Sequence, residues 1–231
     1  MRFIFSIFYS KEIAMNIKDI FILFLILTSS TYSQLNRQEA LKKGGWCGGL
    51  AGWIGWENFK TSEKINGFDS NSKTEGYNFI FSSRNGSLVE TNGVFGFDFQ
   101  WRQKDRTTSP DPNTYNQSEY LNEKIWFLGL WARYYFPLEG EFAMFIEGSG
   151  GYAVFEQVQD KTGFGEAVYN EEKSANGFAY NAGAGFSLFV SPNAAFEITG
   201  RWEGGSLNGD NDLNIKIGNI FILFGFQIFL K

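Results

Sequence analysis

"NGVFGFDFQWRQKD", from Asn92 to Asp105, separates into two rows when it is read two residues at a time. One row consists of Phe95, Phe97, Phe99 and Trp101, and the other consists of Gly96, Asp98, Gln100 and Arg102. Successive side chains of a β-strand point to opposite faces of a sheet. The stretch is therefore predicted to be a strand with one aromatic face and one polar face.

The same alternation recurs along the chain of 231 residues. Strand-like segments are predicted at roughly 45–59, 74–83, 92–104, 123–136, 141–156, 176–190, 194–205 and 214–230. Most reach about ten residues, which is the length that a tilted strand needs to cross a membrane and exceeds the usual five or six of globular strands. The first segment has Gly and Trp on both rows, so a β-bulge there could switch its phase.

The connections between these segments differ in length. Long polar connections are expected at 61–73, 105–122, 158–175 and 205–212, an intermediate one at 83–92, and tight turns at "PLEG" (137–140) and "SPNA" (191–194). Long loops at one end and short turns at the other are typical of an up-and-down barrel. The segments near 105–122 and 157–175 are expected to be extracellular and tolerant of insertion.

The volume of a small barrel decides which row faces out. The interior of an eight-stranded barrel is only wide enough to be filled by side chains, so the aromatic row would overfill it. We therefore expect an all-β, eight-stranded antiparallel up-and-down transmembrane β-barrel, in which closure leaves no backbone edge unpaired in the hydrocarbon. The residues expected to face lipid are Phe95, Phe97, Phe99, Phe186, Phe196, Ile198, Phe224 and Phe226.

The polar row predicts a charged interior. Its candidates for a network of ion pairs in the lumen are Asp98, Arg102, Arg133, Glu147, Glu197 and Arg201. Arg133 and Glu147 flank the turn at 137–140, and counting from it predicts levels that differ by about 10 Å along the strands. Buried charges persist mainly when they are paired, so a plugged lumen is expected. A narrow pore and a carboxylate-only catalytic site are the alternatives.

The N-terminal residues have a different pattern from the rest. Met15 is followed by a lysine, by an apolar core over Ile20–Leu27 and by small residues before Gln34. This order is typical of a secretory signal peptide. We expect a signal peptide at 1–33 with Met15 as a better-placed start, a short lead-in at 34–42 and the barrel at 43–231. Cys47 is expected to be a small apolar strand residue.

Composition excludes several kinds of chemistry. The chain has no histidine and a single cysteine, so Ser-His hydrolysis, Cys/His metal sites and an intramolecular disulfide are excluded. The net charge of −5 argues against a nucleic-acid partner. "NGDNDLN" (Asn208–Asn214) spaces its carboxylates like a calcium loop but lacks the downstream Glu. No catalytic residue, cofactor site or metal site is predicted.

Three stretches carry a resemblance to a known family. They are "GGWCGGLAGWIGW" (Gly44–Trp56), "WARYYFPLEGEFAMFIEGSGGY" (Trp131–Tyr152) and the alternating last segment. With these the chain resembles the small outer-membrane β-barrel proteins of Gram-negative bacteria, the eight-stranded OmpA transmembrane domain/OmpX-like group. Members of that group usually end on an aromatic residue, whereas this chain ends on "FQIFLK".

The resemblance implies a non-enzymatic outer-membrane protein that anchors extracellular loops for envelope integrity or surface interaction. It implies outer-membrane lipid and the barrel-assembly machinery as partners, no nucleic acid, and a monomer; the surface ligand stays open. Three alternatives are a narrow channel for ions or small solutes, a soluble periplasmic ligand-binding barrel with its rings inside, and an accessory subunit of an envelope machine.

Overall fold

The computed structural model describes residues 40–65, 68–110, 118–138, 140–162, 168–209 and 213–230. The expected signal peptide and all but the last residues of the expected lead-in lie outside this range. No helix with the length and hydropathy of a transmembrane helix occurs among the described residues.

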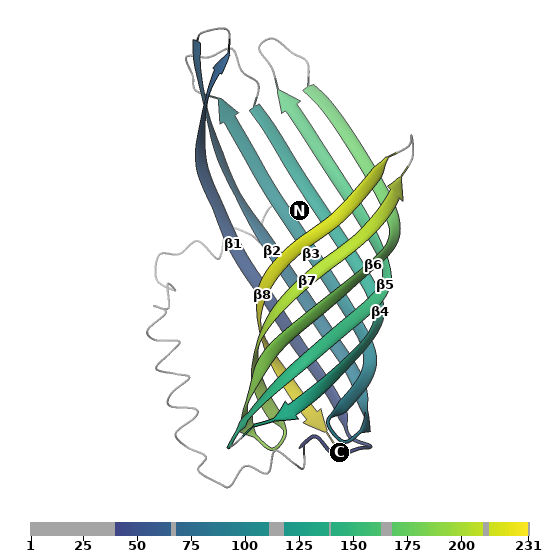
Figure 1. Cartoon of the computed structure of the whole chain (residues 1–231). Helices are drawn as coiled ribbons and strands as arrows, with labels where there is room; N and C mark the ends of the chain where they lie inside the picture. Colours follow the sequence, from purple (N-terminus) through teal and green to yellow (C-terminus); the bar gives the residue numbers. More distant parts are fainter. Residues whose placement is uncertain are drawn as a thin grey trace, which may run out of the picture. The chain divides into compact units, whose positions relative to one another are not determined.

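Eight antiparallel strands pair in chain order and close into a barrel (Figure 1). They are β1 (Trp46–Ile65), β2 (Phe68–Glu90), β3 (Gly93–Pro110), β4 (Ser118–Pro137), β5 (Phe142–Thr162), β6 (Val168–Ser191), β7 (Ala194–Gly209) and β8 (Asn214–Leu230). The predicted fold class, an eight-stranded antiparallel up-and-down barrel, is confirmed.

The strands are longer than predicted at one end of the barrel. β3 continues to Pro110 and β4 begins at Ser118, inside a stretch expected to be a loop, and β5, β6 and β7 also run into expected loops. β1 and β2 likewise pair out to Ile65 and Phe68. These stretches were predicted to be loops because their sequence is polar. A strand whose two faces both meet water needs no apolar row, however, because its backbone hydrogen bonds continue the ladder.

The expected connection at 83–92 is also mostly strand. β2 extends to Glu90 and pairs with β3, so only Thr91 and Asn92 form the turn. Asn92 has a φ of 70°, a left-handed conformation that Asn tolerates better than most residues. The Ser, Asn and Gly residues of this stretch are typical of a loop. In the barrel they lie in β2, which pairs with β1 on one side and with β3 on the other.

The first strand keeps one phase. Its register with β2 runs from Trp46 to Ile65 without a shift, so the bulge considered for it is absent. Trp46, Leu50, Ile54 and Trp56 are exposed, whereas Cys47 is buried. The glycines interleaved between them made both rows look alike in the sequence.

Closure of the barrel is uneven. β1 pairs with β8 only from Trp46 to Gly52, against Leu230 to Phe224, whereas β1 pairs with β2 over its whole length. Figure 1 shows β8 diverging from β1 beyond this contact. The expectation that every edge within the apolar part is paired is therefore wrong along this seam.

The end with the short turns is sealed by apolar side chains. Cys47, Tyr135, Phe145, Phe189 and Phe229 are buried in one cluster, and the Phe189 and Phe229 rings are stacked with centroids 5.4 Å apart. Leu41 joins the cluster, and its carbonyl accepts a hydrogen bond from the Asn92 amide at 2.9 Å. This apolar base closes the lumen below its charged layer.

Candidate functional site

The centre of the lumen holds one carboxylate surrounded by three guanidinium groups. Glu147 of β5 forms ion pairs with Arg84 of β2, with Arg133 of β4 at 2.7 Å and with Arg201 of β7 at 3.0 Å. The Trp131 indole donates a further hydrogen bond to it at 3.2 Å. All four charged side chains are fully buried, so their mutual pairing has to offset their desolvation.

Two more carboxylates complete this layer, which we call the ion-pair plug (Arg84, Asp98, Arg133, Glu147, Glu197 and Arg201). Glu197 accepts from Arg133 at 2.5 Å, from Ser187 at 2.9 Å and from Tyr135 at 3.3 Å. Asp98 lies 3.8 Å from Arg201 and accepts hydrogen bonds from Ser82, Gln100, Ser149 and Asn181. Three positive and three negative groups therefore balance inside the plug.

Five of the six residues expected in the lumen network lie in the plug, and Arg102 does not. Arg102 lies in the upper part of the lumen, away from the short turns, and pairs with Glu203 at 3.1 Å. The predicted network left out Arg84, and it left out Glu203 although alternation puts that residue on the same polar row as Glu197 and Arg201. Arg84 was placed in a connection, although its alternation with Gly86 and Leu88 was the signal that could have assigned it to the inward row.

The spacing between Arg133 and Glu147 also differs from the prediction. These residues are direct register partners across β4 and β5, so no 10 Å difference in level separates them. β4 ends at Pro137 and β5 begins at Phe142. The turn is therefore displaced from the predicted 137–140, which changes the number of residues that separate Arg133 and Glu147 from it.

The outer face of the barrel carries a wide apolar belt. Phe97 is 61% exposed and Phe224 is 58% exposed, although both are large apolar side chains. Of the eight residues expected to face lipid, seven are exposed and Phe226 is half-buried beside Phe196. The belt has one polar interruption on β2, where Ser83, Asn85 and Ser87 face out and the Asn85 amide donates to Ser83 at 3.1 Å.

Aromatic and polar groups mark the upper edge of the belt. Trp101 and Trp126 are stacked with centroids 5.6 Å apart. Four residues beyond Trp101 on the same face, the Asp105 carboxylate accepts hydrogen bonds from Tyr120 at 2.9 Å and from Gln103 at 2.8 Å. The apolar part of this face therefore ends near Asp105, whose carboxylate accepts hydrogen bonds from neighbouring side chains.

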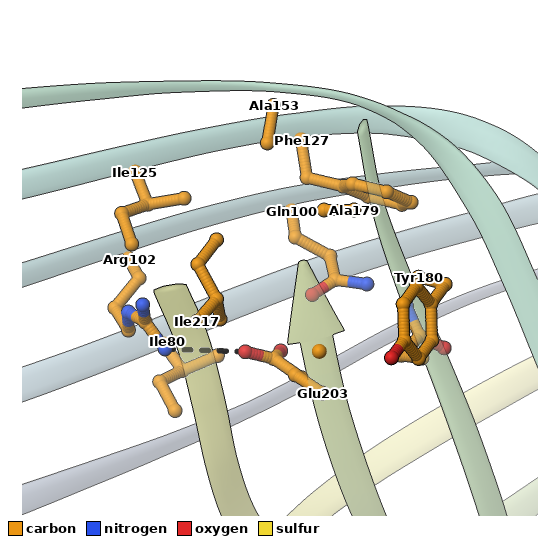
Figure 2. Close-up of a pocket in the computed structure, with 12 residues that line it drawn as sticks. Ile80, Gln100, Arg102, Ile125, Phe127, Ala153, Ala179, Tyr180, Glu203 and Ile217 are labelled. Carbon is orange, nitrogen blue, oxygen red and sulfur yellow. Dashed lines mark hydrogen bonds and ion pairs between the residues drawn. The ribbon is translucent and has the colours of Figure 1, made fainter. Parts of the chain in front are cut away.

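The lumen above the plug is lined differently from the plug itself. A cavity of about 410 Å³ has a polar and charged lining with one apolar wall. The polar side chains are Asn78, Arg102, Lys104, Glu123, Gln157, Lys173, Lys216 and Asn219, and the apolar ones are Ile125, Phe155, Leu213, Ile215, Ile217 and Phe221. Figure 2 shows the adjoining region below it, where the Arg102–Glu203 ion pair lies beside Ile80, Ile125 and Ile217. We call this region, with the 410 Å³ cavity, the upper cavity.

The arrangement offers little for catalysis. The carboxylates of the plug are held by arginines and lack solvent access, so none is placed to exchange a proton with a substrate. No group of three or more side chains that could hold a metal ion occurs in the described part of the chain. The loop at 210–212, within the calcium-like stretch, lies outside the described residues.

Comparisons with known proteins find similarity of fold. No family model matches the chain, and no curated protein matches it. Solved structures with a similar fold include three bacterial proteins. Neisserial surface protein A has 11% identity and a TM-score of 0.41, covering 80% of this chain and 97% of its own. Ail, the attachment invasion locus protein of Yersinia pestis, has 16% identity and a TM-score of 0.41, covering 80% and 99%.

The third is the outer membrane protein OprG from Pseudomonas aeruginosa. It has 13% identity and a TM-score of 0.36, covering 83% of this chain and 98% of its own. At such identities the likeness concerns the fold alone, and the strand pairing of this chain already establishes the eight-stranded barrel. The function has to be argued from the belt, the plug and the upper cavity.

Proposed function

We propose that the chain is a non-enzymatic protein of a bacterial outer membrane, which crosses the lipid with its barrel and presents its long hairpins outside the cell. The observation that carries this proposal is the apolar belt, on which Phe97, Leu128, Phe178 and Ile222 are all more than half exposed. Soluble proteins rarely expose contiguous apolar surface of this extent, so the belt argues against the soluble alternative. Surrounding lipid is the partner that this surface fits.

The plug supports an anchor rather than an open pore. Arginines and carboxylates from β2, β3, β4, β5 and β7 meet across the lumen, and the apolar base lies below them. Envelope integrity and surface interaction are the roles that a blocked barrel with long outer hairpins can serve. The barrel-assembly machinery is the partner expected during insertion, and a monomer is the expected state.

Conductance tests the blocked lumen. The purified chain, reconstituted in a planar lipid bilayer, should show little current. Arg133→Ala should destabilise the barrel, because this side chain bridges the buried Glu147 and Glu197, whereas the apolar base should keep the current of the folded fraction low. Lys173→Ala, which changes a cation above the plug, should leave the current unchanged. A steady large conductance of the unmutated chain would contradict the plugged anchor and support the channel alternative.

Surface labelling tests the orientation. An epitope inserted at Asn113, between the end of β3 and the start of β4, should be labelled by antibody on intact Gram-negative cells, because hairpin ends outside the membrane tolerate insertion. The same epitope inserted after Leu138, in the β4–β5 turn, should be labelled only after the outer membrane is permeabilised. The opposite pattern would reverse the topology.

A further inference from the structure

The polar interruption of the apolar belt occupies three successive outward positions of β2. Ser83, Asn85 and Ser87 fill them, and Phe81 and Val89 continue the same row above and below. Val89 is 52% exposed, and Asn85 and Ser87 are exposed as well. We call Ser83, Asn85 and Ser87 the polar stripe. Because apolar residues follow it in both directions, it lies within the belt and not at its edge.

The height of the polar stripe matches the middle of a membrane. Asn85 precedes the turn residue Thr91 by six positions, which is about 20 Å along a strand. At a strand tilt of about 40° this distance corresponds to a height of about 15 Å. The hydrocarbon core of a bilayer is about 30 Å thick. With the turn at the rim of this core, Asn85 lies near the bilayer midplane.

Large apolar side chains border the polar stripe on both neighbouring strands. Its exposed register partners on β1 and β3 are Trp46, Leu50, Phe95, Phe97 and Phe99. The outward residues at 46–56 of β1, 79–89 of β2 and 95–101 of β3 include no charged side chain. Two copies of this face can therefore approach each other without charge repulsion.

The polar stripe retains unused hydrogen-bonding groups. The Asn85 amide donates to the Ser83 hydroxyl at 3.1 Å. Among the described residues, neither the Asn85 side-chain oxygen nor the Ser87 hydroxyl has a hydrogen-bond partner. Lipid chains cannot supply one at this depth, and a polar group without a partner is unfavourable in an apolar medium. A protein surface that brings its own donors and acceptors would remove this penalty.

A second copy of the chain presents the groups that the polar stripe needs. An Asn side chain both donates through its amide and accepts through its oxygen. Two Asn85 side chains related by a two-fold axis can therefore form two reciprocal hydrogen bonds. A two-fold axis along the membrane normal keeps both copies in the same orientation, and such an interface brings one surface patch against itself. A partner with only donors or only acceptors would leave part of the polar stripe unpaired.

We propose that two copies of the chain associate in the membrane through the outer face of β1–β3, with the polar stripe at the centre of the contact and Asn85 beside the two-fold axis. The apolar side chains around the stripe pack between the two barrels in place of lipid. The inference rests on the proposed membrane placement. It goes beyond the monomer expected above, which leaves the polar stripe against hydrocarbon.

Cross-linking tests the contact surface. In a Cys47→Ala background, which removes the single cysteine, Ser87→Cys keeps Asn85 and places a thiol close to the proposed axis. The full chain, folded in phosphatidylcholine vesicles, should then give a covalent dimer with a short bismaleimide. Leu130→Cys is the matched control, because Leu130 is 52% exposed in the belt but lies on β4, away from the axis. It should give little dimer at the same protein-to-lipid ratio.

Dilution with lipid measures the strength of the association. Copies labelled with a donor or an acceptor dye at Asn113→Cys, in the Cys47→Ala background, should show energy transfer that falls as the protein-to-lipid ratio is lowered. Unlabelled chain should compete. Asn85→Leu should raise the protein-to-lipid ratio at half-association roughly tenfold, since a pair of hydrogen bonds between membrane-spanning segments is worth about one tenfold step in affinity.

A second Asn variant controls for the exchange itself. Asn176→Leu makes the same substitution at an exposed outward position of β6, four strands from β2 around the barrel. It should leave the association unchanged. Heat-modifiable gel mobility confirms that each variant is folded, so that a loss of energy transfer reports association and not unfolding.

The outcomes separate the dimer from the membrane placement. Equal cross-linking of Ser87→Cys and Leu130→Cys would show random collision and overturn the dimer, while the membrane anchor would stand. Unchanged association of Asn85→Leu would overturn the role of the polar stripe in the contact. A folded chain that leaves the vesicles without detergent would instead contradict the membrane placement.

Discussion

Glu147→Gln should destabilise the barrel by about 3–5 kcal/mol, because it leaves buried positive charge without its partner. Arg84 is the side chain most affected, because Glu147 is the carboxylate with which it forms its ion pair. Arg133 keeps Glu197 at 2.5 Å, and Arg201 keeps Asp98 at 3.8 Å. Urea unfolding in lipid vesicles, followed by heat-modifiable gel mobility, measures the change.

Two further variants test this explanation. Arg84→Met combined with Glu147→Gln should recover part of the loss, since the stranded guanidinium is removed. Glu75→Gln disrupts an exposed ion pair with Lys73 and should cost less than about 1 kcal/mol. A loss of less than about 1 kcal/mol for Glu147→Gln would show that the plug does not hold the barrel together.

Phe97→Arg should destabilise the folded barrel in lipid by roughly 2–4 kcal/mol if the residue lies near the bilayer midplane. Phe97 is 61% exposed on the outer face of β3, and a guanidinium there would lose its hydration to hydrocarbon. The same vesicle unfolding experiment measures the effect. Thr107→Arg, on the same face of the same strand but beyond Asp105, should have almost no effect.

The result that would contradict the outward assignment is normal folding of Phe97→Arg together with loss of insertion in Phe97→Leu. Asp98→Asn, at the neighbouring inward position of the same strand, is a poor control. Asp98 is fully buried and accepts hydrogen bonds from Ser82, Gln100, Ser149 and Asn181. An amide nitrogen cannot accept from these donors, so this variant should also be destabilised.

Local pattern was enough to predict the class of fold and the facing of most strands. The alternation of Phe95, Phe97 and Phe99 with Gly96 and Asp98 needs no tertiary information, because a strand has a period of two. The ends of the strands were predicted poorly, since beyond the belt both faces are polar and alternation disappears. There, pairing with neighbours keeps the chain extended.

The partners of the inward charges depended on the closed barrel. Arg84, Glu147 and Arg201 come from β2, β5 and β7 and are far apart in the chain, so no spacing in the sequence relates them. Arg102 has the same inward alternation as Asp98 but lies at another level, where Glu203 is its partner. The height of a residue along the barrel axis depends on the tilt and stagger of the strands, and these are properties of the whole sheet.

The sequence by itself determined that the chain folds into an eight-stranded barrel with rings outside and charges inside, because alternation and the volume of a small barrel leave that solution. Only the tertiary structure decided that Glu147 holds three arginines, that Arg102 pairs with Glu203 above the plug, and that β1 and β8 separate beyond Gly52 and Phe224. These features arise between segments distant in the chain, and they depend on the register and level that closure imposes on each strand.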